Sequence, residues 1–344
     1  MNTDKNNKNC LVGLDAVGPE LRGCSLTIGN FDGVHLGHQR IVQVARELAQ
    51  SQGRPVVALT FEPPPELVLR PRDIPLRVLP HDRRCCALLN AGADVVVTAE
   101  ATAELLSMPP RRFVEEIIVR RFGPLHVVEG QDFHFGAKRS GDVSLLDLMG
   151  RQYGFALHVV QAVMLEAPDG AVRITSSLIR RLVAAGDVQA AARCLGRPYA
   201  LYGTIIAGQG QGRLMEFPTA NISAGQQVVP ADGVYAGRAV IDGRTATDVR
   251  EYPAAISVGH KPTLGPTSDL YIEAFLLDVD RGTGILPVSG TGVPPVGCDF
   301  YGRAMELSFL QRLRPQERFA DADALRRQIA KDVAAVREII LSGK

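Results

Sequence analysis

Two histidines, His35 and His38, lie in the first stretch of the chain whose residue types could do chemistry. Gly29 and Gly33 precede them and free the backbone for a tight turn. The apolar run 26–28 before the turn is typical of a buried strand, and apolar residues recur after it with the period of a helix. Because the N–H groups and the dipole at a helix start attract anions, the stretch predicts a phosphate site that both imidazoles face.

The polar side chains gathered in this turn favour a nucleotide site over a plain turn. The alternative is that the histidines are surface or helix-start residues and that the glycines only shape the chain. We expect the ATP-binding residues of this stretch to be Gly29, Asn30, Phe31, Asp32, Gly33, His35 and His38.

The stretch has neither the Gly-Lys-Ser/Thr nor the Gly-x-Gly-x-x-Gly spacing of the common phosphate loops. It resembles the His-x-Gly-His signature of nucleotidyltransferases. Its longer form, Gly-x-Phe-Asp-Gly-Val-His-x-Gly-His, is similar to the bacterial bifunctional riboflavin kinase/FAD synthetase family. The resemblance implies that FMN attacks the α-phosphorus of ATP, that His35 and His38 are catalytic, and that FAD forms. Positioning and charge neutralisation suffice for such a transfer, so we expect no general base.

Residues 174–180 place hydroxyls ahead of an apolar helical run, which predicts a helix N-cap. An arginine one turn into the helix also makes this a phosphate clamp. The segment is similar to Ile-Ser-Ser-Thr-x-Ile-Arg of the family. We expect Ser176, Ser177 and Arg180 to bind ATP.

Residues 128–142 match most of the family pattern Gly-x-Asp-Phe-x-Phe-Gly-x-x-Arg-x-Gly-Asp. In the segment 60–65, consecutive prolines predict a stiff, non-helical chain, and Pro64 stands where the family has histidine, so we assign no chemistry to it. The alternative for the rings of the first segment, Phe133 and Phe135, is packing beneath a loop. The expected flavin contacts of the adenylyltransferase are Phe61, Asp132, Phe133 and Arg139.

The second half carries a glycine-rich loop followed by Pro-Thr-Ala-Asn, which is similar to the signature of riboflavin kinases. Alternating glycines let backbone N–H groups approach phosphates, although such a loop alone is most often a turn. The resemblance implies that Thr219 and Asn221 hold Mg²⁺, which prefers oxygen ligands. Glu216 departs from the glycine of the family and counts against kinase activity. The implied ATP-binding residues are Gly208, Gly210, Gly212, Arg213, Pro218, Thr219 and Asn221.

Glu273 lies in an alternating strand pattern, where a solvated glutamate is the simplest interpretation. The resemblance implies instead that it is the catalytic base that accepts the proton of the riboflavin 5′-hydroxyl. It also implies that Arg314 and Phe319 lie near the flavin. The Gly/Pro/Thr/Val-rich run 281–297 is expected to be an inserted loop, which costs a fold little stability.

Strands and helices that alternate in the first half predict a parallel α/β sheet that positions the first site at the carboxyl end of a strand. Short strands at regular spacing after residue 195 predict a small barrel, closed by a helix with one apolar stripe at 322–340. We therefore expect an N-terminal Rossmann-like nucleotidyltransferase domain at 13–192. We expect an antiparallel β-barrel kinase domain with a long C-terminal helix at 193–344.

The 344 residues favour two domains, and 46% apolar content is ample for two cores. A net charge of +1 gives no electrostatic case for nucleic-acid or membrane partners. The six cysteines form no Cys-x-x-Cys pair, and the polar N-terminus lacks a signal core. We expect a cytoplasmic protein, a monomer or weak homo-oligomer, with a mobile tail up to about Val12.

Three hypotheses remain open from the sequence. The first is an enzyme that phosphorylates riboflavin to FMN and adenylylates FMN to FAD, with ATP as co-substrate and Mg²⁺ as cofactor. The second keeps the fold with only the FMN adenylyltransferase active. The third is a non-catalytic flavin-binding protein, against which the intact polar residues of both motifs count.

Overall fold

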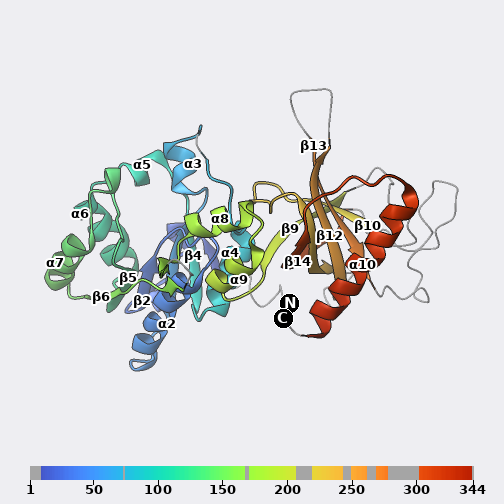
Figure 1. Cartoon of the computed structure of the whole chain (residues 1–344). Coiled ribbons are helices and arrows are strands. Elements are labelled where there is room, and N and C mark those ends of the chain that lie inside the picture. Colours follow the sequence, from blue (N-terminus) through green and yellow to red (C-terminus); the bar gives the residue numbers. More distant parts are fainter. Residues whose placement is uncertain are drawn as a thin grey trace. The chain divides into compact units, whose positions relative to one another are not determined.

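The computed structural model describes residues 9–72, 74–166, 170–206, 219–242, 249–261, 269–277 and 302–342. These residues form two compact units, one within residues 2–176 and one within residues 177–344. Figure 1 shows both units and labels their helices and strands where there is room. No described helix is both long and apolar enough to cross a membrane.

The first unit is built on a parallel sheet. Its described strands are β1 (Cys10–Val12), β2 (Ser25–Ile28), β3 (Val56–Phe61), β4 (Val95–Ala99), β5 (His126–Gly130) and β6 (Ala156–Val160). They lie in the order β1-β4-β3-β2-β5-β6 with parallel pairing throughout. The direction of winding reverses between β2 and β5, and ligands of such sheets bind outside the strand ends at that point. The predicted α/β fold is confirmed.

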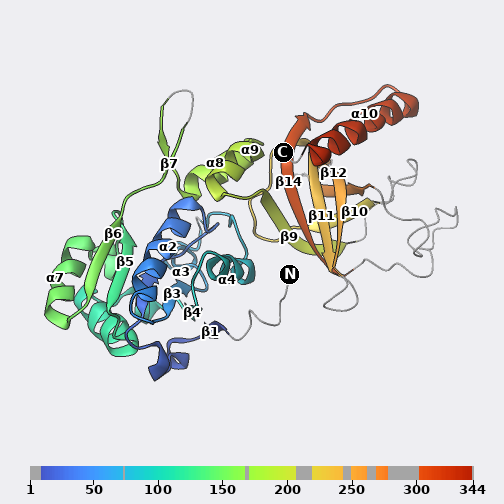
Figure 2. The ribbon, with the colours of Figure 1, turned by 90° about the horizontal axis from the view of Figure 1, so that it is seen from below.

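Helices cover both faces of this sheet. The described helices are α2 (Leu36–Gln50), α3 (Pro65–Leu69), α4 (His81–Asn90), α5 (Ala103–Leu106), α6 (Pro110–Phe113), the π-helix η4 (Val114–Phe122) and α7 (Val143–Tyr153). Short 3-10 turns are η2 (Leu14–Ala16), η3 (Pro19–Leu21) and η5 (Ala137–Arg139), and a hairpin is formed by β7 (Met164–Leu165) and β8 (Val172–Arg173). Helix α2 packs against β2, β3 and β5 (Figure 2).

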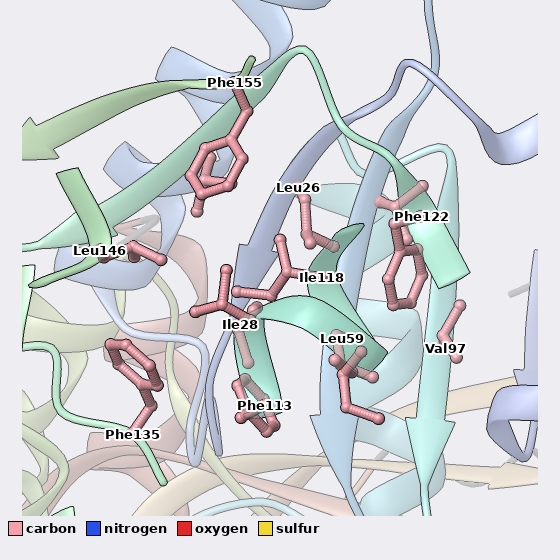
Figure 3. Packing of buried hydrophobic residues seen from close by; sticks show 14 of the residues in the cluster. Leu26, Ile28, Leu59, Val97, Phe113, Ile118, Phe122, Phe135, Leu146 and Phe155 are labelled. Atoms are coloured by element: carbon pink, nitrogen blue, oxygen red, sulfur yellow. The ribbon is translucent and has the colours of Figure 1, made fainter. Parts of the chain in front are cut away.

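A hydrophobic core fills the space between the sheet and α6, η4 and α7 (Figure 3). Alternate residues of the central strands, such as Leu26 and Ile28, meet aromatic and aliphatic side chains of the helices, such as Phe113 and Ile118. The burial of each such side chain stabilises the fold by about 1.5–3 kcal/mol. This core fixes the end of β2, from which the first candidate site begins.

The second unit is a closed antiparallel barrel with three described helices packed on it or leading into it. Its elements are α8 (Ser176–Ala184), α9 (Val188–Leu195), β9 (Tyr199–Ile206), β10 (Thr219–Ser223), β11 (Gly233–Asp242), β12 (Val249–Lys261), β13 (Asp269–Leu276), β14 (Ala304–Arg314) and α10 (Ala322–Leu341). The strand order is β10-β13-β12-β11-β14-β9, and β9 pairs with β10 to close the barrel. Helix α10, red in Figure 1, packs Val333 and Val336 against Ala236 and Ala255 on the outside of β11 and β12.

One local prediction was wrong: residues 10–12 are not a mobile tail, because β1 pairs with β4 at the edge of the sheet. The segment 60–65 is non-helical up to Pro64, as expected, and the short helix α3 begins at Pro65, since proline suits the first helical position. The strand β10 was not among the strands expected from the sequence.

Candidate active sites

The loop between β2 and α2 has an unusual backbone. Phe31, Gly33 and Val34 have φ values of 49°, 83° and 41°. Positive φ is rare for a β-branched residue such as Val34 and costs about 1–3 kcal/mol. The Val34 N–H donates to the Phe31 carbonyl at 2.9 Å and closes the turn. Strain of this kind gathers at functional sites, where the surrounding structure must hold it in place.

His35 and His38 form a stacked pair at the start of α2. Their ring centroids lie 3.6 Å apart with an interplanar angle of 20°. His35 is the N-cap, and its Nδ1 accepts the His38 backbone N–H at 3.4 Å. The His35 ring also leaves little room for a side chain at Gly37, because a Cβ at that position would lie 3.1 Å from the ring. The two histidines predicted as catalytic are therefore brought together at a helix N-terminus.

His38 is a neutral hydrogen-bonding group rather than a fixed cation. Burial lowers the pKa of His38 well below its ordinary value, and the neighbouring His35 lowers it further. The ring of Phe31 meets His38 edge-on at 5.3 Å. The Nδ1 atom of His38 is buried and has no hydrogen-bond partner among the described residues.

Two polar side chains of the loop, Asp32 and Asn30, form hydrogen bonds that anchor it to neighbouring segments. The Asp32 carboxylate accepts the backbone N–H groups of Val78 and Leu79 at 3.0 and 3.1 Å, just before α4. The Asn30 amide donates to the Glu66 carboxylate of α3 at 2.9 Å. We infer that these two side chains hold the strained backbone in place, whether or not they also touch a nucleotide.

Of the three residues in 174–180 that are expected to bind ATP, Ser176 contacts the loop directly. Its hydroxyl donates to the Asp32 carbonyl at 2.8 Å, across 144 residues of sequence. Ser177 and Arg180 lie further along α8, in the residues counted with the second unit. Their participation in this site remains a prediction.

The segment after β5 carries the predicted flavin contacts. Phe133 stacks on Phe135 with ring centroids 5.5 Å apart, and Phe135 is buried in the hydrophobic core. The alternative of packing beneath the loop therefore holds for Phe135. Half-buried Phe61 and Phe133 pack against the same core, Asp132 forms an ion pair with Arg173, and Arg139 is exposed with a φ of 58°.

In the barrel, strand register brings the predicted kinase residues together. Asn221 of β10 lies directly opposite Glu273 of β13, and Glu273 lies opposite Ser257 of β12. Opposed residues of antiparallel strands share a face, with Cβ atoms about 4.5–5.5 Å apart. Their strand neighbours Ala220, Ile272 and Ala274 are buried inside the barrel, so this row faces outward.

A second row of the same outer face connects the site to α10. Thr219 lies opposite Phe275, and Phe275 lies opposite Ala255. Phe275 and Ala255 belong to the cluster that packs against α10. Thr219 and Asn221, the predicted magnesium ligands, thus share one face of β10 beside the carboxylate of Glu273.

Arg314 is held by an ion pair rather than left to solvent. Its guanidinium contacts the Asp332 carboxylate of α10 through Nη2 at 2.7 Å and Nε at 3.1 Å. The side chains are 14% and 7% exposed, and the guanidinium carbon lies 5.6 Å from the centre of the Phe319 ring. The two residues predicted to lie near the flavin therefore contact each other.

Several predicted residues lie outside the described residues, and nothing in the structure bears on them. They are Gly208, Gly210, Gly212, Arg213, Glu216, Pro218 and the segment 281–297. Two residues not predicted from the sequence lie at the sites, Ser257 in the outer row and Glu129 at the end of β5. A glutamate within an apolar strand run was a signal for Glu129, but its partner cannot be read from the sequence.

Both halves of the chain match known protein families. The FAD synthetase family profile matches residues 18–177, and the riboflavin kinase profile matches residues 195–340. A protein of Pseudomonas fluorescens described as a bifunctional riboflavin kinase/FMN adenylyltransferase is 35% identical over 327 residues, 95% of this chain and 96% of its own length. The protein of the same description from Escherichia coli K12 is 32% identical over 316 residues, 92% of each chain.

The chain belongs to the bifunctional riboflavin kinase/FMN adenylyltransferase family. As in its relatives, the FAD synthetase part comes first and the flavokinase part second. A crystal structure from Streptococcus pneumoniae, described as a macrolide-efflux protein, covers 96% of this chain and 99% of its own, with a TM-score of 0.78 and 25% identity. Members of this family are enzymes with two activities, a kinase and a nucleotidyltransferase, and this chain carries both parts.

Proposed function

We propose that residues 29–38 hold the triphosphate of ATP while the phosphate of FMN attacks its α-phosphorus. The attack forms FAD and expels pyrophosphate, and the already ionised phosphate needs no general base. His35 and His38 donate hydrogen bonds to non-bridging oxygens where negative charge builds up, together with the first N–H groups of α2. The observation that carries this proposal is the stacked histidine pair at the head of α2, beside a strained loop at the reversal point of the sheet.

Flavin binding in this unit is proposed for Phe61, Asp132, Phe133 and Arg139. The half-buried ring of Phe61 ends β3 and that of Phe133 follows β5, and these two strands lie on either side of β2 in the sheet. A flat aromatic ring system suits such rings by stacking. Ser177 and Arg180 are proposed as further contacts to the phosphates of ATP.

In the barrel, we propose that Glu273 accepts the proton of the riboflavin 5′-hydroxyl as that oxygen attacks the γ-phosphorus of a second ATP. Its position opposite Asn221, on a half-buried outward face, supports this role. The glycine loop 208–213 and Pro218 are proposed to cradle the phosphates, and Arg314 with Phe319 to border the flavin.

Magnesium fits the donor set of the barrel site. A hydroxyl from Thr219 and an amide carbonyl from Asn221 share one face of β10, and hard cations prefer such oxygen ligands. Among the described residues, no group of three or more His, Cys, Asp or Glu could hold a metal. Thr219 and Asn221 would therefore share the ion with ATP phosphates, whose charge it neutralises.

Two narrower hypotheses are distinguished from this one by activity. Pro64 in place of histidine, Glu216 and the segment 281–297 are grounds for an enzyme that has lost one of its two activities. Glu216 and 281–297 belong to the kinase half, so the FMN adenylyltransferase is the activity that such an enzyme would keep. A flavin-binding protein without catalysis would not need the paired histidines or the Asn221–Glu273 pair. Nothing in the two sites described supports the efflux function that the S. pneumoniae structure is named for.

The domain limits 13–192 and 193–344 remain our proposal. Riboflavin, FMN and ATP are the proposed small-molecule partners, without nucleic acid or membrane. The cytoplasmic location and the monomeric or weakly oligomeric state expected from the sequence also stay predictions.

The test supplies the full chain with ATP and Mg²⁺, and with either riboflavin or FMN, and separates the flavins by chromatography. Riboflavin is expected to give FMN and then FAD, and FMN is expected to give FAD. FAD from FMN alone would support the single-activity hypothesis, and no turnover of either flavin would overturn the proposal.

A further inference from the structure

A buried carboxyl group lies beneath the proposed nucleotide loop. Glu129, the penultimate residue of β5, is only 2% exposed. Its Oε1 accepts the backbone N–H of Ile28 at 2.6 Å, although the two residues are 101 positions apart. Ile28 is the last residue of β2, and the loop with the histidine pair begins at the next residue.

The strand register explains why this N–H needs a side-chain partner. Strands β2 and β5 pair only at Ser25–His126 and Leu26–Val127, whereas β2 remains paired with β3 up to Ile28–Leu59. The N–H of Gly29 donates to the Leu59 carbonyl of β3. Because N–H groups alternate sides along a strand, that of Ile28 faces β5, where the ladder has ended. A buried N–H left without a partner would cost stability, and the Glu129 carboxyl replaces the missing ladder bond.

The chemistry of the carboxyl suits this place. Burial raises the pKa of Glu129 well above its ordinary value, although the hydrogen bond from Ile28 opposes the shift. The group therefore keeps its proton to a higher pH than an exposed glutamate does. In its protonated form, the carboxyl accepts the Ile28 N–H without adding a negative charge beside bound phosphates.

Helix α2 contacts the same point of the sheet. A Cβ on Gly130 would lie 3.7 Å from the Ile41 methyl of α2, so the end of β5 meets the helix that follows the loop. Side chains alternate faces along a strand, so Glu129 lies on the opposite face of β5 from the contact with α2. The carboxyl therefore acts on the loop through the end of β2.

We propose that Glu129 is a positioning residue of the adenylyltransferase site: by binding the Ile28 N–H across the gap between β2 and β5, it sets the course of residues 29–35. It links the two central strands beyond the point where their ladder ends and touches no reacting atom. This inference rests on the proposed binding of ATP by that loop.

The experiment compares Glu129→Gln and Glu129→Leu in the full chain, with Glu47→Leu as a control at an exposed glutamate of α2. FAD formation from FMN gives KM for ATP and kcat, and FMN formation from riboflavin in the same sample reports an intact chain. Glutamine keeps an acceptor of the same shape, so we expect KM and kcat within about threefold of the parent enzyme. Leucine removes the acceptor, so we expect KM for ATP to rise at least tenfold with the kinase rate unchanged.

Two results would overturn the inference. Unchanged kinetics in a folded Glu129→Leu variant would show that the hydrogen bond does not position the loop. Equal loss in Glu129→Gln and Glu129→Leu would show that an ionised carboxylate is required. If the leucine variant does not fold, Glu129→Asp replaces it, because the shorter side chain moves the acceptor away from the Ile28 N–H. An unchanged KM for ATP in that variant would also contradict the inference.

His38→Ala separates this inference from the function on which it depends. If His38→Ala leaves FAD formation intact, the proposed nucleotide loop itself is wrong. If His38→Ala suppresses FAD formation while Glu129→Leu does not, only the role of Glu129 fails.

Discussion

The two candidate sites are built in different ways. In the first unit, the backbone of one loop is strained and braced, and its histidines are packed against each other at a helix start. In the barrel, the described groups stand on regular strands, and register alone brings Asn221 and Glu273 side by side. The first site is therefore specified by backbone conformation, and the second by which residues face the same way.

This difference predicts different sensitivity to mutation. A braced loop depends on groups outside it that support its backbone, such as Glu66 and Glu129. A row on a strand face tolerates change around it as long as the barrel is closed, but it fails when the one reactive side chain is lost. The following predictions test this contrast, from the largest expected effect to the smallest.

Glu273→Gln is expected to have the largest effect. Loss of a general base typically costs a factor of about 10²–10⁴ in rate, so FMN formation from riboflavin should fall by this amount. FAD formation from supplied FMN should not change. Initial rates with each flavin measure both effects. An unchanged rate of FMN formation would show that the Glu273 carboxylate is not the catalytic base.

Asp332→Ala tests what holds α10 beside the barrel site. Arg314 and Asp332 are a largely buried ion pair, and the removal of one partner of such a pair costs about 3–5 kcal/mol. Thermal unfolding followed by circular dichroism should show a lower unfolding temperature of the barrel. Below that temperature, the variant should still form FAD from FMN. The matched control is Asp323→Ala, whose exposed pair with Arg326 should contribute less than about 1 kcal/mol. Equal effects of the two variants would contradict this prediction.

His38→Ala is expected to lower FAD formation from FMN about 10²–10³-fold, as the loss of one donor to a developing negative charge does. FMN formation should be spared. His158→Ala, at another half-buried histidine of the same unit, is the control and should leave both rates unchanged. A similar loss in the control would point to general damage to the sheet.

The smallest effect concerns pH. Burial raises the pKa of Glu129 in the folded chain, so above the ordinary glutamate range the folded state binds more protons than the unfolded state. This contribution to stability is complete below the unfolded pKa and is lost as pH rises through the folded pKa. Relative to Glu129→Gln, the parent chain should therefore lose stability as pH rises above about 4.3. Urea unfolding at several pH values measures the difference, and a constant difference would show that the carboxyl does not titrate differently on folding.

The sequence was most informative where a motif depends on local backbone chemistry. The strand, glycine turn and helix around His35 and His38 could be predicted because glycine and apolar spacing act over a few residues. The barrel was predicted from strand spacing, but the partner of Glu273 was not, because register is a property of two distant strands. The same holds for Ser176 with Asp32 and for Glu129 with Ile28, whose contacts span 144 and 101 residues.

The central claim is that two separate sites perform two reactions. It is tested most directly by supplying riboflavin or FMN, with ATP and Mg²⁺, to His38→Ala and Glu273→Gln side by side and by quantifying the flavin products. We predict that His38→Ala accumulates FMN from riboflavin without FAD, and that Glu273→Gln makes FAD from FMN but nothing from riboflavin. Loss of both reactions in either folded variant would contradict the account.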